Sequence, residues 1–390
     1  MLRFLTAGES HGEGLTVIVE GMPAGLPIAE EQITRDLARR QQGYGRGGRM
    51  LIERDQSHLL SGVRHGFTLG SPIALFIANR DWQNWREQMN VAPVETEIAP
   101  VTRLRPGHAD LAGALKYGQH DVRNILERAS ARDTAARVAA GAVARRFLDE
   151  LGVTVRSHTV SIGEATIEEA EPVDWSRVEA SPVRCGIESI EHAMMAEIDR
   201  AKNQGDTIGG IFEIQALAVP PGLGSHVHWD RRISANLAQA VMSINAVKGV
   251  EIGDGFRLAS VPGSQAHDVI TLGEDDSGAG PWHHLTNHAG GIEGGITNGE
   301  SIVVRAVIKP IPTLAKPLPS VDLLTGEPVN AHYERSDVCM VPAAGVVGEA
   351  MVALVLAEAC LEKFGGDHLQ ETQRNLAAYL SSLQRPGHSA

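Results

Sequence analysis

The stretch from 343 to 361, AAGVVGEAMVALVLAEACL, is the most apolar long segment of the chain. A membrane-spanning helix needs about 20 consecutive apolar residues, so this segment must be weighed as one. Glu349 and Glu358 interrupt it, and we therefore expect a buried helix over 343–364. The N-terminus, MLRFLTAGESHGEG, lacks the apolar core of a signal peptide. These features predict no membrane association and a cytoplasmic location.

The chain is acidic, with 35 basic and 48 acidic residues and a formal net charge of −13. This balance argues against a general nucleic-acid binder, which would carry a basic footprint. Aromatic residues make up only 4%, so the core must be built mainly from Ala, Val, Ile and Leu. The 42 glycines indicate many tight turns or backbone pressed against a ligand. Cys185, Cys339 and Cys360 are far apart and support neither a disulfide framework nor a zinc cluster.

Apolar periodicity predicts strands and helices interspersed along the chain. Strands are expected at 2–6, 15–22, 50–53, 72–79, 153–163, 207–219, 267–272 and 300–308. Helices are expected at 29–41, 134–151, 187–203, 231–247 and 343–364. The order lacks the regular alternation of a doubly wound sheet, so the predicted class is α+β. We find no repeat and no linker, and we expect one domain over 1–375 followed by a loose tail over 376–390.

Residues 43–48, GYGRGG, match the dinucleotide-binding pattern G-x-G-x-x-G literally. That pattern requires a strand before it and a helix after it, whereas here a helix precedes and a strand follows. We therefore reject a Rossmann site. Two interpretations stay open at this point: a plain flexible loop, or a loop that delivers Arg46 and Arg49 to an anionic ligand.

Residues 103–110, RLRPGHAD, concentrate Arg103, Arg105 and His108 beside a turn. A histidine alone is more often structural than catalytic. Beside an arginine pair it is less easily dismissed, because guanidinium groups bind and orient anions.

Residues 128–134, RASARDT, precede a predicted helix, and Ser130 with Asp133 fits the S-x-x-D capping signal of an ordinary helix start. A helix N-terminus also offers unpaired N–H groups and the positive end of the dipole. Arg128 and Arg132 flank this start, and we expect Arg132 to be exposed. We favour a phosphate site over a bare cap.

Two further loops carry unusual backbone chemistry. Residues 288–298, HAGGIEGGITN, place four glycines within six residues, as close approach to a flat or phosphorylated ligand requires. Two prolines stiffen residues 309–313, KPIPT. No cysteine or carboxylate lies at recognised metal-ligand spacing from four paired histidines, which we interpret as surface or loop residues, and no metal is expected: His226, His228, His283 and His284.

Taken together, these segments resemble the chorismate synthase family. The resemblance rests on eight blocks that occur in the family's order and span nearly the whole chain: GESHG at 8–12, RRQQGYGRGGRM at 39–50, RPGHAD at 105–110, RASARDTAAR at 128–137, MSINAVKGVEIGDGF at 242–256, HAGGIEGGITNGE at 288–300, KPIPTL at 309–314 and RSDVC at 335–339. It implies a large β-α-β-α sandwich and a homotetramer.

The resemblance also implies an activity. Members of the family bind reduced FMN and convert 5-enolpyruvylshikimate 3-phosphate (EPSP) to chorismate by trans-1,4-elimination of phosphate, the last common step toward the aromatic amino acids. NADPH would then serve only indirectly, as a source of reducing equivalents, and a separate flavin reductase is an expected partner. EPSP brings a phosphate and two carboxylates, which arginines from separate loops could surround.

Site residues carry over position by position. The resemblance implies that substrate contacts come from Ser10, Arg46, Arg49, Arg105, Arg132 and Arg335. It implies FMN contacts from Arg128, Ala129, Ser130, Asn245, Ala246, Gly294, Lys309, Pro310, Ile311, Pro312, Thr313 and Arg335. It places NADP contacts at Arg40 and Arg46.

Three residues are implied to be catalytic. The resemblance assigns His11 to protonation near the leaving phosphate and His108 to the reduced flavin. Asp337 would relay the proton taken up at the flavin N5. Histidine suits such work because its pKa lies near neutrality and neighbouring anions raise it.

Two alternatives come from other functional classes. A non-catalytic protein that binds a phosphorylated ligand could keep the same arginine cavity, although an intact set of His11, His108 and Asp337 speaks against it. An RNA-binding protein could also use many arginines, but low aromatic content and acidic charge disfavour it.

Overall fold

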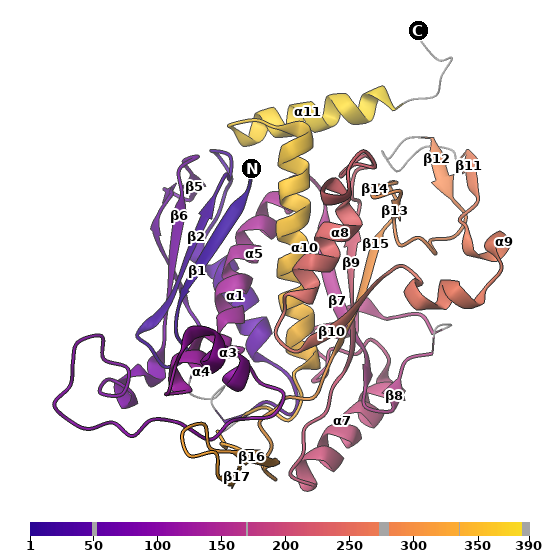
Figure 1. Cartoon of the computed structure of the whole chain (residues 1–390). Coiled ribbons are helices and arrows are strands. Elements are labelled where there is room, and N and C mark those ends of the chain that lie inside the picture. Colours follow the sequence, from indigo (N-terminus) through magenta and orange to yellow (C-terminus); the bar gives the residue numbers. More distant parts are fainter. Residues whose placement is uncertain (49–52, 169–170, 273–280, 335, 384–390) are drawn as a thin grey trace.

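Two antiparallel β-sheets enclose a layer of helices (Figure 1). This computed structural model describes residues 1–48, 53–168, 171–272, 281–334 and 336–383. Every strand pairing within the two sheets is antiparallel. Helices that come before or after these strands in the chain pack between the two sheets. The predicted α+β class is therefore confirmed, and so is a sandwich of sheets and helices.

The first sheet has the strand order β1-β2-β6-β3. Its strands are β1 (Arg3–Gly8), β2 (Gly14–Glu20), β6 (Ile73–Ala78) and β3 (Ser57–Ser61). Along β2 every second residue is buried, so Leu15, Val17 and Val19 face the helices while Ile18 is exposed. This period of two fixes which face of the sheet joins the core.

The second sheet has the order β10-β15-β9-β7-β8. Its strands are β10 (Val247–Ile252), β15 (Ile302–Ile308), β9 (Gly210–Leu217), β7 (Thr154–Ile162) and β8 (Ala165–Thr166). Val155, Ile214 and Val304 are buried and belong to the same core as the residues of the first sheet.

Helix α10 (Val341–Phe364) occupies the centre of the helical layer and packs against α5 (Asp133–Asp149), α1 (Glu30–Gln41) and α8 (Ile233–Met242) (Figure 1). Among the described residues it is the one helix long and apolar enough to cross a membrane, yet 83% of its most apolar window is buried. The expected buried helix is confirmed. A Cβ at Gly141 of α5 would lie 2.3 Å from the Cβ of Ala350, so small residues allow the two helices their close approach.

Glu349 lies in the middle of α10 and is fully buried. Its carboxylate accepts N–H groups from Arg39 of α1 at 2.7 and 2.9 Å and from Arg184 at 3.1 Å, and Ser157 of β7 donates to it at 2.7 Å. Arg145 of α5 lies 3.0 Å away. Burial alone would raise the pKa of Glu349, but the guanidinium groups hold it below its ordinary value.

The remaining elements lie outside the two large sheets and the central helices. Helix α7 (Glu188–Asn203) packs against the β7–β8 end of the second sheet. The other elements are β4 (Val63–Arg64), β5 (Phe67–Thr68), η1 (Arg80–Asn84), α3 (Asp110–Tyr117), α4 (Arg123–Ala129), α6 (Trp175–Val178), η2 (Trp229–Arg231), η3 (Gly255–Ser260), α9 (Gly263–Ala266), β11 (Ile270–Leu272), β12 (Trp282–His284), β13 (Ile292–Glu293), β14 (Ile296–Thr297), β16 (Pro319–Val321), β17 (Pro328–Asn330) and α11 (Leu369–Ser382).

Some predictions need correction. Residues 376–382 are not a loose tail but the second half of α11, which buries Leu369 and Leu376 across the end of α10 and begins with a capping box at His368 and Glu371. Residues 384–390 lie outside the described residues, as does most of the strand expected at 50–53. Helix α8 ends at Met242, five residues before the predicted end, because the chain turns there into β10. The side chain of His284 is only 6% exposed, so it is not a surface residue.

Replacing Glu349 by alanine tests the buried ion cluster. The substitution leaves three guanidinium groups inside the helical layer without their carboxylate. We expect the free energy of unfolding to fall by about 3–5 kcal/mol, the usual cost of removing one partner of a buried ion pair. Urea unfolding at pH 7 measures it. Glu362→Gln, which alters an exposed pair with Arg231, should change little. Equal midpoints for Glu349→Ala and the wild type would contradict a stabilising role.

The same cluster predicts a pH dependence. The pKa of Glu349 is lower in the folded protein than its ordinary 4.5, so its contribution to stability is complete above about pH 4.5. That contribution is lost as the pH falls through the folded value. We therefore expect the stability difference between the wild type and Glu349→Ala to shrink when urea unfolding is repeated toward pH 4. A difference that grows on acidification would contradict the assigned direction.

Candidate active site

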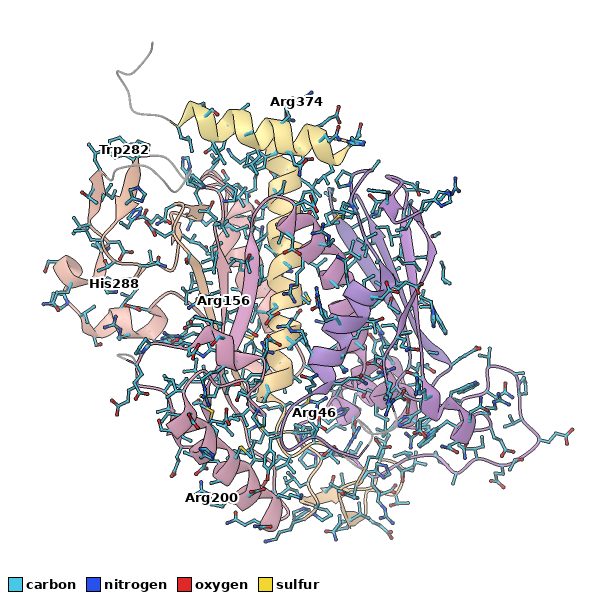
Figure 2. All side chains as sticks on the ribbon, turned by 180° about the vertical axis from the view of Figure 1, so that it is seen from behind. Arg46, Arg156, Arg200, Trp282, His288 and Arg374 are labelled. Carbon is cyan, nitrogen blue, oxygen red and sulfur yellow. The ribbon has the colours of Figure 1, made fainter. Side chains whose placement is uncertain are left out.

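A cavity of about 800 Å³ brings together most residues predicted from the sequence, near the N-terminal end of α10, where Figure 2 labels Arg46. Its size is that of a typical cofactor or substrate site. The predicted residues on its wall are Ser10, His11, Arg40, Arg46, Arg105, His108, Ala129, Ser130, Arg132, Asn245, Ala246, Lys309, Ile311, Pro312, Thr313 and Asp337.

The turn between β1 and β2 presents Ser10 and His11 to this cavity. Gly8 has a φ of +107°, and a Cβ there would lie 2.3 Å from the carbonyl oxygen of Gly14, so only glycine permits the turn. Asn79, which follows β6, donates its side-chain N–H groups to the carbonyls of Glu9 at 3.0 Å and Gly12 at 2.7 Å. The neighbouring strand therefore fixes the shape of the turn.

The imidazole ring of His11 is contacted both at its edge and on its face. Glu127 of α4 accepts from the His11 backbone N–H at 2.7 Å and from Nδ1 at 2.8 Å. The ring of Trp85 lies against the imidazole, with centroids 4.1 Å apart. Burial would raise the pKa of Glu127, but its hydrogen bonds with His11 and Arg123 hold it below the ordinary value. An ionised carboxylate can only accept hydrogen bonds, so Nδ1 of His11 carries a proton. Nε2 is then the ring nitrogen that can interact with a ligand.

His108, which also lines the cavity, is held in a similar way. Its Nδ1 bonds to Asp110, a fully buried residue at the start of α3. Arg105 donates to both carboxylate oxygens of Asp110, at 2.9 and 3.0 Å. Desolvation would raise the pKa of Asp110, but His108 and Arg105 push it far below its ordinary value. The histidine is thus fixed by an ionised carboxylate.

Two buried arginines form an anion-binding wall. Arg132 donates to Asp55 at 2.6 Å and to Asn79 at 2.9 Å, and Arg40 donates to Thr134 at 2.8 Å. Nη1 of Arg40 and Nη2 of Arg132 are buried and make no hydrogen bond among the described residues, although Asp55 lies 3.6 Å from the first and Glu53 lies 3.9 Å from the second. Burial lowers the pKa of Arg40 to about 10, and the neighbouring Arg132 adds to this effect. An anion would satisfy both N–H groups and relieve the mutual repulsion.

The start of α5 differs from the prediction. Arg132 is the N-cap residue and makes no side-chain cap, and Ser130 Oγ bonds to Ser10 at 3.2 Å and accepts from the backbone N–H of Arg132 at 3.3 Å, not from that of Asp133. The carboxylate of Asp133 forms ion pairs with Arg128 at 2.8 Å and with Arg137 at 3.0 Å. The S-x-x-D capping interpretation is therefore wrong. The expected exposure of Arg132 is wrong as well, since it is 4% exposed.

The glycine-rich loop delivers Arg46 to the cavity beside Asp337. Nη1 of Arg46 lies 2.9 Å from the Asp337 carboxylate, which also accepts from the backbone N–H of Gly47 at 2.6 Å. A Cβ at Gly47 would lie 2.8 Å from the carbonyl oxygen of Ser336, so the two loops touch through their backbones. Of the two interpretations left open for 43–48, delivery of Arg46 fits this geometry.

A third stretch of wall comes from residues after α8 and β15. The Asn245 side chain donates to the Ala129 carbonyl at 3.0 Å, while its Oδ1 is buried without a hydrogen-bond partner in the described part of the chain. Ala246 has a left-handed φ of +68° and accepts from the backbone of Lys309 at 3.0 Å. Lys309 Nζ in turn donates to the Gly107 carbonyl at 2.5 Å. Asn245, Ala246 and Lys309 therefore line the same cavity as Arg40 and Arg132.

Several predicted residues do not line the cavity. The guanidinium of Arg128 bonds to the Thr6 carbonyl at 2.9 Å, beside β1, and Pro310 is exposed. Gly294 forms the turn between β13 and β14, close to His226. The resemblance assigns these three residues to FMN, and that assignment stays a prediction, since they do not line this cavity. Arg49 and Arg335 lie outside the described residues.

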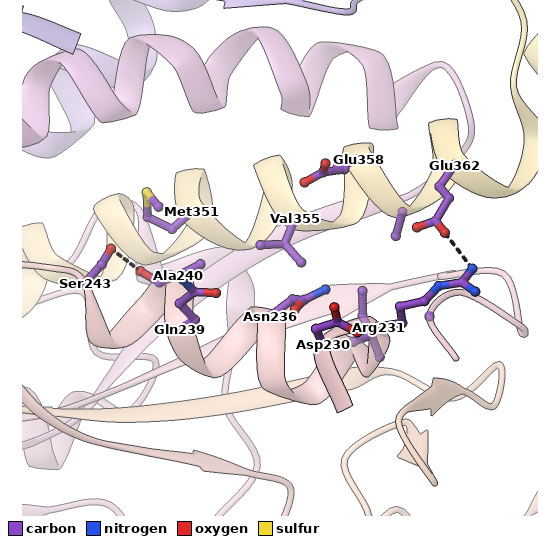
Figure 3. A pocket seen from close by; sticks show the side chains of 13 residues that line it. Asp230, Arg231, Asn236, Gln239, Ala240, Ser243, Met351, Val355, Glu358 and Glu362 are labelled. Atoms are coloured by element: carbon purple, nitrogen blue, oxygen red, sulfur yellow. Dashed lines mark hydrogen bonds and ion pairs between the residues drawn. The ribbon is translucent and has the colours of Figure 1, made fainter. Parts of the chain in front are cut away.

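A second cavity of about 440 Å³ lies between α8 and α10 (Figure 3). Its wall carries Asp230, Glu358 and Glu362, and its arginine, Arg231, is paired with Glu362 at 2.7 Å. Burial raises the pKa of Glu358. This acidic rim is unsuited to a phosphorylated ligand, so the arginine-walled cavity is the candidate active site.

Sequence reasoning missed the residues that support the histidines. Glu127, Asp110 and Trp85 contact the imidazoles, and Glu334 lies on the cavity wall. Asp110 ends the RPGHAD block, and Glu127 directly precedes RASARDT, so their positions beside recognised blocks were the available signal. Nothing in the local sequence indicated Trp85, which lies in the irregular segment after β6.

Comparisons with known proteins identify the family of this chain. The family model for chorismate synthase matches residues 2–361. The chorismate synthase of Moorella thermoacetica is 62% identical over 387 residues, which cover 98% of this chain and 100% of that protein. That of Aquifex aeolicus is 54% identical and covers 98% of both chains. A crystal structure of a chorismate synthase aligns with a TM-score of 0.79 at 46% identity over 98% of both chains.

Arg132→Ala tests the anion wall. It removes a buried guanidinium and leaves Asp55 without its closest partner, so we expect weaker binding of inorganic phosphate and a stability loss of about 3–5 kcal/mol. Arg132→Lys keeps the positive charge but loses the forked geometry of the guanidinium. Its phosphate affinity and its stability should lie between those of the wild type and Arg132→Ala. Calorimetric titration and urea unfolding measure the two effects. Arg128→Ala is the matched control, since its guanidinium is outside the cavity. Unchanged phosphate binding in Arg132→Ala would remove Arg132 from the site.

Proposed function

Because the chain belongs to the chorismate synthase family, we infer that it is the lyase that converts EPSP to chorismate and phosphate by trans-1,4-elimination. It thereby catalyses the last common step of aromatic amino acid biosynthesis. The observation that carries this conclusion is the cavity in which two carboxylate-bound histidines face an arginine wall.

The charge of the substrate matches the wall. EPSP carries a phosphate and two carboxylates, and the cavity offers Arg40, Arg46, Arg105 and Arg132. We propose that the unsatisfied N–H groups of Arg40 and Arg132 hold one of these anions. Ser10 would add a hydroxyl contact. Arg49 and Arg335 are proposed as further substrate residues from the resemblance alone.

The donor set also fits FMN. Asn245 Oδ1 is a buried acceptor that makes no hydrogen bond with any residue the structure describes, as an N–H of a flavin ring would require, and basic groups nearby suit the FMN phosphate. The residues that would hold FMN are Ala129, Ser130, Asn245, Ala246, Lys309, Ile311, Pro312 and Thr313. Reduced FMN, when bound, supplies the electron density that helps an allylic phosphate leave.

The chain's own residues supply the proton chemistry. His11, oriented by Glu127, would donate a proton from Nε2 near the departing phosphate. His108, oriented by Asp110, would donate a hydrogen bond to the reduced flavin. Asp337, held by Arg46 and Gly47, would relay the proton that is removed from the substrate.

The geometry favours a substrate role over a nicotinamide role for two arginines. Arg40 is almost fully buried, and Arg46 is paired with Asp337. We therefore propose that NADPH acts only indirectly, through a separate flavin reductase. From the family we further propose a homotetramer that works in the cytoplasm, with no nucleic acid or membrane partner.

The alternative of a non-catalytic phospho-ligand binding protein is disfavoured by one observation. Anion binding alone needs the arginines, yet His11, His108 and Asp337 are each fixed by dedicated partners at the same cavity. A binding protein has no need of such preorganised proton donors and acceptors.

Cofactor dependence gives a direct test. Under anaerobic conditions, we expect chorismate to form from EPSP with chemically reduced FMN, and little turnover with NADPH alone. Chorismate absorbance and released phosphate measure the reaction. No turnover with reduced FMN would reject the proposed function, and strong activity with NADPH plus oxidised FMN, without a reductase, would reject the indirect role of NADPH.

The histidines give a second test. His11→Ala and His108→Ala should each lower kcat by roughly 10²–10⁴-fold, which is the usual effect of removing general acid–base help. Binding of FMN and EPSP should survive, because the arginine wall is untouched. Steady-state kinetics and fluorescence titration of FMN separate the two effects. Normal kcat in both variants would mean that the histidines are structural.

A further inference from the structure

Glu127 accepts three N–H groups at once. Oε2 accepts from the backbone N–H of His11 at 2.7 Å, and Oε1 accepts from His11 Nδ1 at 2.8 Å and from Arg123 at 3.0 Å. The Glu127 carbonyl accepts from the backbone N–H of Ser10 at 3.0 Å. The end of α4 therefore fixes both the main chain and the ring of the first candidate catalytic residue.

Only an ionised carboxylate can fill this position. Both of its oxygens act as acceptors, and together they meet a backbone donor, a ring donor and a guanidinium. Glutamine has the same shape but only one oxygen, so its NH₂ group would face an N–H group. The side chain of Glu127 is 2% exposed, so water cannot replace the lost acceptor.

An ion-pair chain joins this pair to the second histidine. Arg123, which bonds to Glu127, also donates to Glu334 at 2.9 Å. The other oxygen of Glu334 lies 3.7 Å from Arg105, which holds the His108–Asp110 pair. Arg123 also covers the Trp85 ring at 4.9 Å. Hence one continuous network of alternating charges connects the two carboxylate–histidine pairs around the cavity.

We propose that Glu127 is the positioning residue that sets the Nδ1–H tautomer and the ring orientation of His11, and that the Arg123–Glu334 pair locks it to the His108–Asp110–Arg105 group. The two histidines are then aimed into the cavity as one unit. This proposal rests on the proposed function for its kinetic test, but its spectroscopic test does not.

The kinetic test uses the full-length protein with reduced FMN and EPSP. Glu127→Gln should lower kcat by roughly 10- to 100-fold, as loss of a residue that orients a histidine does, while KM changes by less than about threefold. Glu334→Gln should lower kcat by roughly three- to tenfold. The double variant should lose less than the product of the single losses, because both residues act on one unit. Glu362→Gln is the matched control and should keep the kinetics of the wild type.

The spectroscopic test needs no turnover. In protein labelled with ¹⁵N-histidine, the side-chain nitrogens of His11, assigned from the spectrum of His11→Gln, should show the Nδ1–H tautomer. Glu127→Gln should shift His11 toward the Nε2–H form, and Glu362→Gln should not.

The outcomes separate the two hypotheses. No chorismate from the wild type would reject the proposed function and leave the tautomer shift as the measure of positioning. An active wild type with unchanged kcat in both Glu127→Gln and Glu334→Gln, or an unchanged His11 tautomer in Glu127→Gln, would overturn the positioning role. Should Glu127→Gln fail to fold, normal kcat in Glu334→Gln, whose side chain is 25% exposed, would overturn the link between the pairs.

Discussion

The carboxylate of Glu349, in the middle of the central helix α10, is the contact on which the arrangement of the layers depends. Arginines from α1, from α5 and from the loop before α7 converge on it, and a serine of β7 completes its shell. An apolar helix alone could rotate or slide among small side chains. A buried carboxylate has one satisfactory position, because displacement would leave several charges without partners. The ion cluster therefore specifies how the helices sit between the sheets.

The candidate active site is built in the same way. Arg132 is paired with Asp55, Arg105 with Asp110 and Arg46 with Asp337. Each carboxylate offsets the cost of burying its guanidinium, and all three arginines line the cavity. The arginines are thus held in place before any ligand arrives, so binding need not order them. A chain with a net charge of −13 can in this way hold a ligand with several negative charges.

Much of this fold and part of the site could be predicted from the sequence, and particular residues show which features could not. Elements with clear periodicity, such as the helices at 134–151 and 343–364, formed close to the expected ends. Helix α11 was missed because its three buried residues, Leu369, Thr372 and Leu376, include only two apolar side chains. The burial of Arg132 was invisible because its partner, Asp55, is 77 residues away in the chain. Local patterns report local structure, whereas ion pairs across the cavity depend on the assembled sheets.

The pairing of each arginine also determines what kind of recognition the cavity can perform. A guanidinium that already faces a carboxylate contributes little net charge, so it attracts a distant anion weakly and binds a near one through directed N–H groups. Lysine could supply the charge but could not pair with a carboxylate and a ligand in the same plane. Recognition then depends on where the acceptor oxygens of the ligand lie, not on its total charge. Arg40, Arg132 and Asn245 line one cavity, and Nη1 of Arg40, Nη2 of Arg132 and Oδ1 of Asn245 make no hydrogen bond within the described part of the chain, so a ligand set that is anionic at one place and a donor at another would suit them. A phosphorylated substrate beside a flavin meets both requirements, whereas inorganic phosphate meets only the first.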